Sequence, residues 1–238
     1  MLLIKVMKIF YDGLDIEKYA QYPVVEGFTT NCTFFRDRND VRQEAQNYTE
    51  FYNNNKELLL WRSISLQIWE HGDLGIEQID AIHAIDKNIF VTIPIINSND
   101  DINESLLAHA VSNNMRINVT AIYTYAQMNI TYQCLKKTTN DAIVSVFAGG
   151  ISDSGIDPSL FIIHAKRLFK DMPNVQILWA GCRELYSIKR AEDLDCDIIA
   201  VPGHILDKLN LFNTDLNKMS VDLVNDMRNN AICGGISI

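Results

Sequence analysis

The sequence predicts an α/β fold, a closed (β/α)8 barrel, from three observations. Eight short apolar segments alternate with segments of helical spacing along the 238 residues. Each strand–helix unit takes roughly 25–30 residues, which is the length that such a unit needs. No glycine-rich phosphate loop follows the first strand, and this favours a barrel over a doubly wound open sheet. We expect a single domain over residues 1–238, with an extra helix at the C-terminus.

The strands are expected where short apolar, β-branched runs end in turn or polar residues. The first run ends at Asp12 and Gly13, and the fourth, FVTIPII, ends at Asn97. Thr92 is the polar residue in the middle of that fourth run, where a hydroxyl needs a partner or a cavity. The expected strands are residues 7–11, 24–31, 63–69, 88–95, 116–123, 142–148, 174–180 and 197–201.

The helices are expected between these strands, where apolar residues recur three and four positions apart. Pro158 stands in the first turn of one helix, and Asp100 or Asn103 caps another. Three consecutive asparagines at 53–55 weaken the helix before the third strand and predict a break there. The expected helices are residues 15–21, 41–60, 75–85, 102–113, 125–135, 157–170, 184–192, 204–209 and 221–229.

Composition and charge restrict the partners. The net charge of −9, with no local cluster of Lys and Arg, argues against a nucleic-acid partner. No apolar run approaches a membrane span, and the opening MLLIKVM is too short for a signal peptide. Met7 is an alternative start to Met1, because the first strand begins there. The five cysteines form no CxxC and the histidines show no metal spacing, so we expect a cytoplasmic protein with free thiols, no metal and no cofactor.

Polar side chains stand at the C-terminal ends of most expected strands, where barrel enzymes carry their chemistry. A turn or cap is the commoner explanation for any one of these positions. Their joint appearance at consecutive strand ends favours a common site. The residues at these ends are Asp12, Thr29, Thr30, Asn31, Gln67, Thr92, Asn118, Thr120, Tyr123, Ser145, Phe147, Trp179 and, just beyond, Arg183.

Several of these strand ends resemble the transaldolase family, and most closely its small bacterial branch that includes fructose-6-phosphate aldolase. The blocks GFTTN, VTAIYTYAQ and VFAGGISDSGIDP carry the resemblance, which covers nearly the whole chain. It implies a TIM barrel and class I aldol chemistry, in which a lysine on strand four forms a Schiff base with a ketose carbonyl. It also implies a small-molecule sugar or sugar phosphate as substrate, and a homo-oligomer.

The resemblance implies a role for each matched residue. Asp12 matches the acid/base aspartate and Asn31 the asparagine of the TTN motif. Gln67 and Thr120 match the pair that holds a water, and Thr92 stands at the position of the lysine. These five are the candidate catalytic residues. The candidate substrate-binding residues are Thr29, Thr30, Phe147, Trp179 and Arg183.

Three departures from the family pattern separate this chain from a Schiff-base aldolase. Strand four reads VTIP where the family has a pattern close to VKIP, so Thr92 replaces the lysine. Gly150 stands where the family has a phosphate-binding arginine, and Gly181 where it has a phosphate-binding serine. Lys87 is the nearest lysine in sequence, but it lies about 16 Å from Thr92 along an extended strand and on the opposite face.

A threonine hydroxyl forms no iminium, so we expect no Schiff-base activity. Two hypotheses remain open. In the first, the chain is an enzyme of sugar carbon–carbon chemistry that runs an enolisation, isomerisation or lyase step on a sugar without the usual phosphate. In the second, it is a degenerate family member that binds a sugar or a protein partner without turnover.

Overall fold

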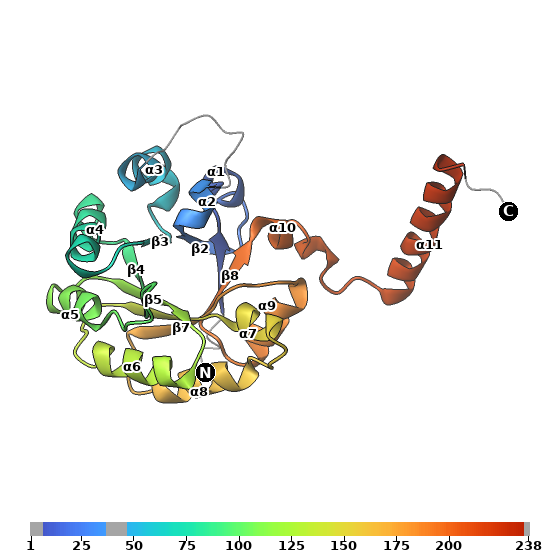
Figure 1. Ribbon diagram of the computed structural model, residues 1–238. Coiled ribbons are helices and arrows are strands. Elements are labelled where there is room, and N and C mark those ends of the chain that lie inside the picture. Colours follow the sequence, from blue (N-terminus) through green and yellow to red (C-terminus); the bar gives the residue numbers. More distant parts are fainter. Residues whose placement is uncertain (1–6, 37–46, 236–238) are drawn as a thin grey trace, which may run out of the picture.

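The computed structural model, which describes residues 7–36 and 47–235, confirms the predicted barrel with its additional C-terminal helix. Eight parallel strands pair in sequence order, and the barrel closes where the first strand pairs with the last (Figure 1). The strands are β1 (Lys8–Asp12), β2 (Val25–Thr30), β3 (Ser63–Gln67), β4 (Phe90–Pro94), β5 (Ile117–Ile122), β6 (Ala142–Val146), β7 (Val175–Trp179) and β8 (Ile198–Pro202).

Helices alternate with the strands and surround the barrel (Figure 1). The described helices and 3₁₀ turns are α1 (Ile16–Tyr19), α2 (Cys32–Arg36), α3 (Tyr48–Asn55), η1 (Lys56–Leu59), α4 (Gly72–Ile85), α5 (Glu104–Ser112), α6 (Tyr125–Leu135), α7 (Ala148–Asp153), α8 (Ser159–Leu168), α9 (Leu185–Asp193), α10 (Gly203–Leu206), η2 (Leu209–Leu211) and α11 (Leu216–Cys233).

Most differences from the sequence prediction concern short helices and helix ends. The predicted break at residues 53–55 is confirmed, because α3 ends at Asn55 and a 3₁₀ turn follows; residues 41–46 of that predicted helix lie outside the described residues. Two short helices that directly follow strands, α2 and α7, were not predicted. The last helix starts earlier than predicted, since Asp215 caps it by accepting a hydrogen bond from the Lys218 backbone N–H at 2.9 Å.

Two separate apolar clusters form the core, because successive strand residues point to opposite sides. Val91 and Ile93 of β4 belong to the larger cluster, which fills the space between the barrel and its helices. Phe90, on the other side of the same strand, belongs to a smaller cluster inside the barrel. That inner cluster consists of Phe10, Phe90, Ile143, Leu178, Ala180, Ile198 and Ala200. The barrel interior is therefore apolar below the level of Asp12 and Thr92, on the side of the N-terminal ends of β1 and β4.

The C-terminal helix α11 stands away from the barrel (Figure 1). None of its residues is buried, although it spans Leu216–Cys233. The sequence alone did not decide whether this helix covers the flank of its own barrel, and in the structure it does not. Its apolar side chains are therefore open to solvent in the single chain.

Candidate active site

The barrel interior is polar near the C-terminal ends of the strands. In β1 and β4, Phe10 and Phe90 lie in the inner cluster, so alternation places Asp12 and Thr92, two residues further on, inside the barrel above them. Strand register sets Gln67 beside Thr92 and Thr92 beside Asn118. Side chains from neighbouring strands thus converge at the C-terminal end of the barrel, where a (β/α)8 enzyme has its active site.

Asp12 is a carboxyl inside the barrel whose pKa lies above its ordinary value. Its Oδ1 accepts a hydrogen bond from the Thr29 hydroxyl at 2.7 Å, and the two residues are register partners on β1 and β2. Burial in the barrel raises the pKa of Asp12 from its ordinary value of 3.8 to about 6, and the Thr29 hydrogen bond opposes part of this increase. A carboxyl with such a pKa can both accept and release a proton under physiological conditions.

Thr92 lies in the same polar layer, with only 5 % of its surface exposed. Its hydroxyl oxygen is buried, and no described residue provides it with a hydrogen-bond partner. Buried hydroxyls are normally paired, so the Thr92 hydroxyl is available to pair with a group that enters the barrel.

A hydrogen-bonded chain of three buried side chains crosses the interior close to Thr92. The Ser145 hydroxyl donates to Asn118 Oδ1 at 2.7 Å, and Asn118 Nδ2 lies 3.4 Å from Ser65 Oγ. The sequence placed Asn118 and Ser145 at strand ends but assigned them no role, and it missed Ser65. The alternation in SISLQ was the available signal, because it puts Ser65 on the same face as Gln67.

Asn31, Gln67 and Thr120 surround this layer near its upper edge. Asn31 follows β2 directly, and its Oδ1 accepts from the Thr33 backbone N–H at 2.9 Å, which leaves its amide nitrogen as a donor. The Tyr48 hydroxyl donates to the backbone carbonyl of Gln67 at 2.7 Å and so fastens α3 to the end of β3. Thr120 is buried and has Pro94 as its register partner on β4.

A β-bulge aims Tyr123 at the mouth of the barrel. The register between β5 and β6 shifts between Val119 and Ile122, and Ala121 in the bulge has φ +60°. Ile122 consequently packs in the outer cluster, and the next residue, Tyr123, turns toward the interior. Its ring lies against Phe147, with 5.3 Å between the centroids. The two aromatic side chains line one side of the mouth.

The structure does not bring three of the predicted substrate-binding residues into the interior. Thr30 shares a strand face with Phe28, which packs in the outer cluster. Trp179 also belongs to that cluster, where the Arg190 guanidinium lies 5.8 Å from its ring. Arg183 is exposed beyond β7, and its Nε and Nη2 donate to Asp153 Oδ2 at 2.9 and 2.6 Å. Their roles in substrate binding stay predictions.

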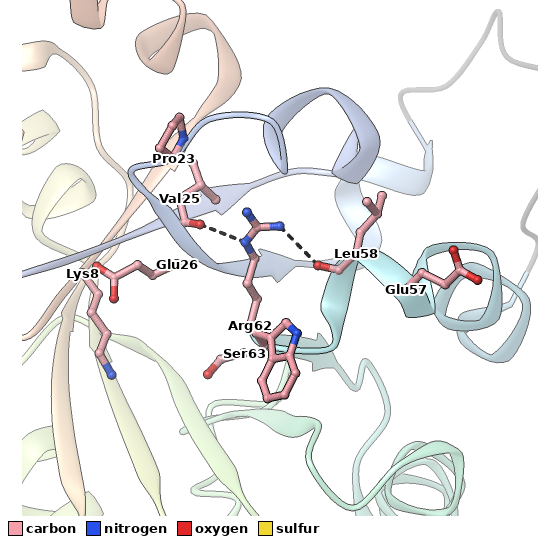
Figure 2. Close-up of a pocket in the computed structure, with 9 residues that line it drawn as sticks. Lys8, Pro23, Val25, Glu26, Glu57, Leu58, Arg62 and Ser63 are labelled. Atoms are coloured by element: carbon pink, nitrogen blue, oxygen red, sulfur yellow. Dashed lines mark hydrogen bonds between the residues drawn. The ribbon is translucent and has the colours of Figure 1, made fainter.

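A cavity of about 510 Å³ lies at the opposite end of the barrel (Figure 2). Its lining includes Lys8, Val25 and Ser63, which are the first residues of β1, β2 and β3. Arg62 points into the same region and is held by backbone carbonyls, with bonds of 3.1 Å to Val25 and 3.3 Å to Leu58. Its bonds fasten the loop before β3, so we assign this region to stability rather than to the site at the other end.

Metal binding and membrane insertion find no support in the described part of the chain. Within residues 7–36 and 47–235, no group of three His, Cys, Asp or Glu side chains is arranged to hold a metal ion. None of the helices in these ranges combines the length and the apolar character that crossing a bilayer requires.

Comparison with known proteins identifies the family of this chain. The profile of the family described as transaldolase/fructose-6-phosphate aldolase matches residues 9–232. A probable transaldolase of Nitrosopumilus maritimus (strain SCM1) is 22 % identical over 210 residues, which cover 85 % of this chain and 87 % of the relative. The match extends over almost every element described above, from β1 to α11. The chain therefore belongs to the transaldolase/fructose-6-phosphate aldolase family of carbohydrate metabolism.

Proposed function

We propose that this barrel acts on a sugar or sugar phosphate by aldol or related enolisation chemistry, and that it does so by proton transfer without a Schiff base. The observation that carries the proposal is Asp12, an acid inside the barrel whose pKa is raised to about 6. Family membership supports the class of substrate. The Thr92 side chain, which stands at the position that the family resemblance gives to lysine, has no amine with which to form the covalent adduct.

The proposed step is the removal of a proton from the carbon next to a ketose carbonyl. The Asp12 carboxylate takes the proton, the C–H electron pair forms a carbon–carbon double bond, and the carbonyl oxygen becomes an enolate. Hydroxyl and amide donors in the same layer, such as Thr92 and Asn118, would stabilise that oxygen. Return of the proton from Asp12 to the same carbon reverses the step. If the neighbouring hydroxyl first gives its proton to the enolate oxygen, return of the Asp12 proton to the former carbonyl carbon completes an isomerisation. A water held by Gln67 and Thr120, as the family resemblance implies, would assist the proton transfer.

Exchange of carbon-bound hydrogen with solvent tests this step. The protein is incubated in D2O with fructose, dihydroxyacetone or fructose 6-phosphate, and NMR follows deuterium incorporation next to the carbonyl. We expect incorporation with the native chain and its loss in Asp12→Asn. Asp171→Asn is the matched control, because Asp171 is an exposed acid in the loop between α8 and β7. Absence of exchange with all three ketoses would contradict the enzymatic proposal.

A second candidate function is binding of a sugar or a protein partner without turnover. The unpaired, buried Thr92 hydroxyl favours it, because that group can hold a ligand but offers no covalent step. Under this alternative, a sugar raises the melting temperature of the native chain while no deuterium is incorporated. The exchange measurement and the melting measurement together separate the two candidates.

We also propose that the chain works in the cytoplasm as a single functional unit of residues 1–238 and without nucleic acid. Its free cysteines, two of them buried in the core, support a reducing compartment. The net charge of −9 disfavours binding to a polyanion.

A homo-oligomer is the proposed state of assembly, and α11 supports it. Leu216, Met219, Leu223 and Met227 follow each other at intervals of three and four residues and so form one apolar stripe. Between 43 and 79 % of the surface of each is exposed. A stripe of this kind along a projecting helix would gain stability by packing on another copy of the chain, because apolar area would leave contact with water there.

A further inference from the structure

The mouth of the barrel beside β5 and β6 is aromatic. Tyr123 leaves the bulge at the end of β5, and Phe147 follows β6 directly. Their rings are tilted by 37° with centroids 5.3 Å apart, so they present neighbouring faces. Part of this surface is open, because 41 % of Tyr123 is exposed.

Gly150 of α7 leaves room for the Tyr123 ring. A Cβ at position 150 would lie 2.5 Å from the Tyr123 hydroxyl oxygen and 2.6 Å from its Cε1, which is closer than such atoms approach. The backbone N–H of Tyr123 donates to Gln127 Oε1 at 2.8 Å and fixes the start of the side chain. The ring therefore occupies the space that any side chain at position 150 would need.

The neighbouring loop after β7 is equally short of polar side chains that could hold an anion. Gly181 has φ +73°, a conformation that strains other residues, and a Cβ on Gly149 would lie 1.7 Å from the Gly181 carbonyl oxygen. This loop contains one positively charged residue, Arg183, among the described residues. Its guanidinium already donates two hydrogen bonds to Asp153 of α7. Backbone and a neutralised ion pair thus form this side of the mouth.

We propose that Tyr123 and Phe147 bind the C–H face of an unphosphorylated sugar. Tyr123 is the residue that sets the preference for an unphosphorylated over a phosphorylated sugar. An aromatic face packs well against the C–H groups on one side of a sugar ring or chain, and the Tyr123 hydroxyl adds a polar end. A phosphate placed there would lose its hydration without gaining a charged partner from α7 or the β7 loop. This inference rests on the proposed function, because it names the substrate class of the same site.

Paired sugars test the preference. Calorimetric titration of the native chain with fructose and with fructose 6-phosphate gives the ratio of the two Kd values. We expect tighter binding of fructose. The double variant Tyr123→Ala/Gly150→Arg removes the ring and adds a cation, so its preference should shift toward fructose 6-phosphate by about tenfold or more. Tyr125→Ala is the matched control, because Tyr125 stacks on Phe161 at 4.4 Å and should leave the ratio unchanged.

The outcomes separate this inference from the proposed function. If the native chain binds fructose 6-phosphate more tightly than fructose, the inference is overturned and the proposed function stands. If the native chain binds neither those sugars nor dihydroxyacetone, both are overturned. If the double variant does not fold, Asp153→Asn provides the second test: it frees Arg183 and should tighten binding of fructose 6-phosphate several-fold. An unchanged ratio in every folded variant also overturns the inference.

Discussion

Asp12 and Thr92 share the barrel interior but differ in what each offers a substrate. Asp12 contributes a carboxyl with a raised pKa, which accepts a hydrogen bond from the Thr29 hydroxyl at 2.7 Å. Thr92 contributes a buried hydroxyl without a partner. Both groups are costly to the fold in the absence of a ligand, because one places a carboxylate in a poorly hydrated space and the other leaves a donor unused. Such costs are typical of residues kept for function.

Asp12→Asn should stabilise the protein above neutral pH. The folded pKa of about 6 exceeds the ordinary 3.8, so the native state binds the proton more strongly than the unfolded state does. The free energy of unfolding therefore falls as pH rises from about 4 through about 6. The asparagine variant has no carboxyl to ionise, so its free energy of unfolding does not fall in this way. At pH 8 it should exceed that of the native chain by about 1–3 kcal/mol, and the difference should disappear near pH 4. Denaturant unfolding at both pH values measures it, and equal stability at pH 8 would refute the burial argument.

Borohydride treatment tests the absence of a Schiff base. The native chain, incubated with dihydroxyacetone or fructose 6-phosphate and then reduced, should show no added mass. The physical reason is that the hydroxyl of Thr92 cannot form an iminium. A trapped adduct on any lysine would contradict this expectation.

Restoring an amine at the same position tests the remaining machinery. Thr92→Lys places a lysine in a buried layer beside Asn118, with Asp12 in the same barrel interior, and should give weak aldolase activity on unphosphorylated ketoses. Mass spectrometry after borohydride should then show an adduct on residue 92. A folded but inactive variant would favour the hypothesis of binding without turnover.

The junction of β5 and α6 sets the geometry of the mouth of the barrel. Thr124 and Gln127 form a capping box: the Thr124 hydroxyl accepts from the Gln127 N–H at 3.2 Å, and Gln127 Oε1 accepts from the Thr124 N–H at 3.0 Å. The same Oε1 accepts from the N–H of Tyr123. One glutamine side chain thus joins the helix start to the aromatic surface.

Thr124→Ala should lower the free energy of unfolding by about 1 kcal/mol, because it removes the helix cap. It should also weaken binding of fructose, since the Tyr123 backbone loses part of its support. Denaturant unfolding and calorimetric titration measure the two effects. Ser112→Ala, at the exposed end of α5, is the control and should change neither quantity. A capping variant with native stability would show that packing alone holds this junction.

The elements that the sequence predicted best are those with a clear period. The eight strands were predicted because each is short, apolar and followed by turn residues. The short helices α2 and α7 were missed because each begins within two residues of the end of a strand and is too short to show a period. The bulge at Ala121 was also missed, since no glycine marks its positive φ.

Strand ends predicted the site less completely than they predicted the fold. Asp12, Thr92 and Thr120 reach the interior, whereas Thr30 and Trp179 stand at strand ends but face the helices. Proximity to a strand end does not say which face a side chain takes, and a register shift can reverse it. The pairing of Arg183 with Asp153 joins segments 30 residues apart and has no sequence signature.

The barrel and the C-terminal helix α11 differ in how much apolar surface each buries within the chain. The barrel buries two apolar clusters of its own, whereas α11 buries nothing within its chain. The proposed assembly would give α11 the packing that it lacks within its own chain, whereas the barrel needs no such partner.

The double change Leu223→Lys/Met227→Lys should dissociate the proposed oligomer, because it places two charges on the apolar stripe of α11. Light scattering after gel filtration should give the mass of the single chain, 27.1 kDa, in place of a multiple of it. Circular dichroism should show a folded barrel in both cases. Asn225→Lys, on the polar side of the same helix, is the control and should keep the native mass. A native chain that already elutes at the mass of one copy would contradict the proposed assembly.

The closure of the barrel between β1 and β8 has a consequence for the order of events during synthesis. Residue Lys8 pairs with Ile198, so the first strand waits for almost the whole chain before its second neighbour exists. Without β8, one edge of β1 and one edge of β7 would have no strand to pair with. Until the last strand is in place, these open edges can pair with another chain. The step that completes the barrel is thus also the step that removes its exposed edges.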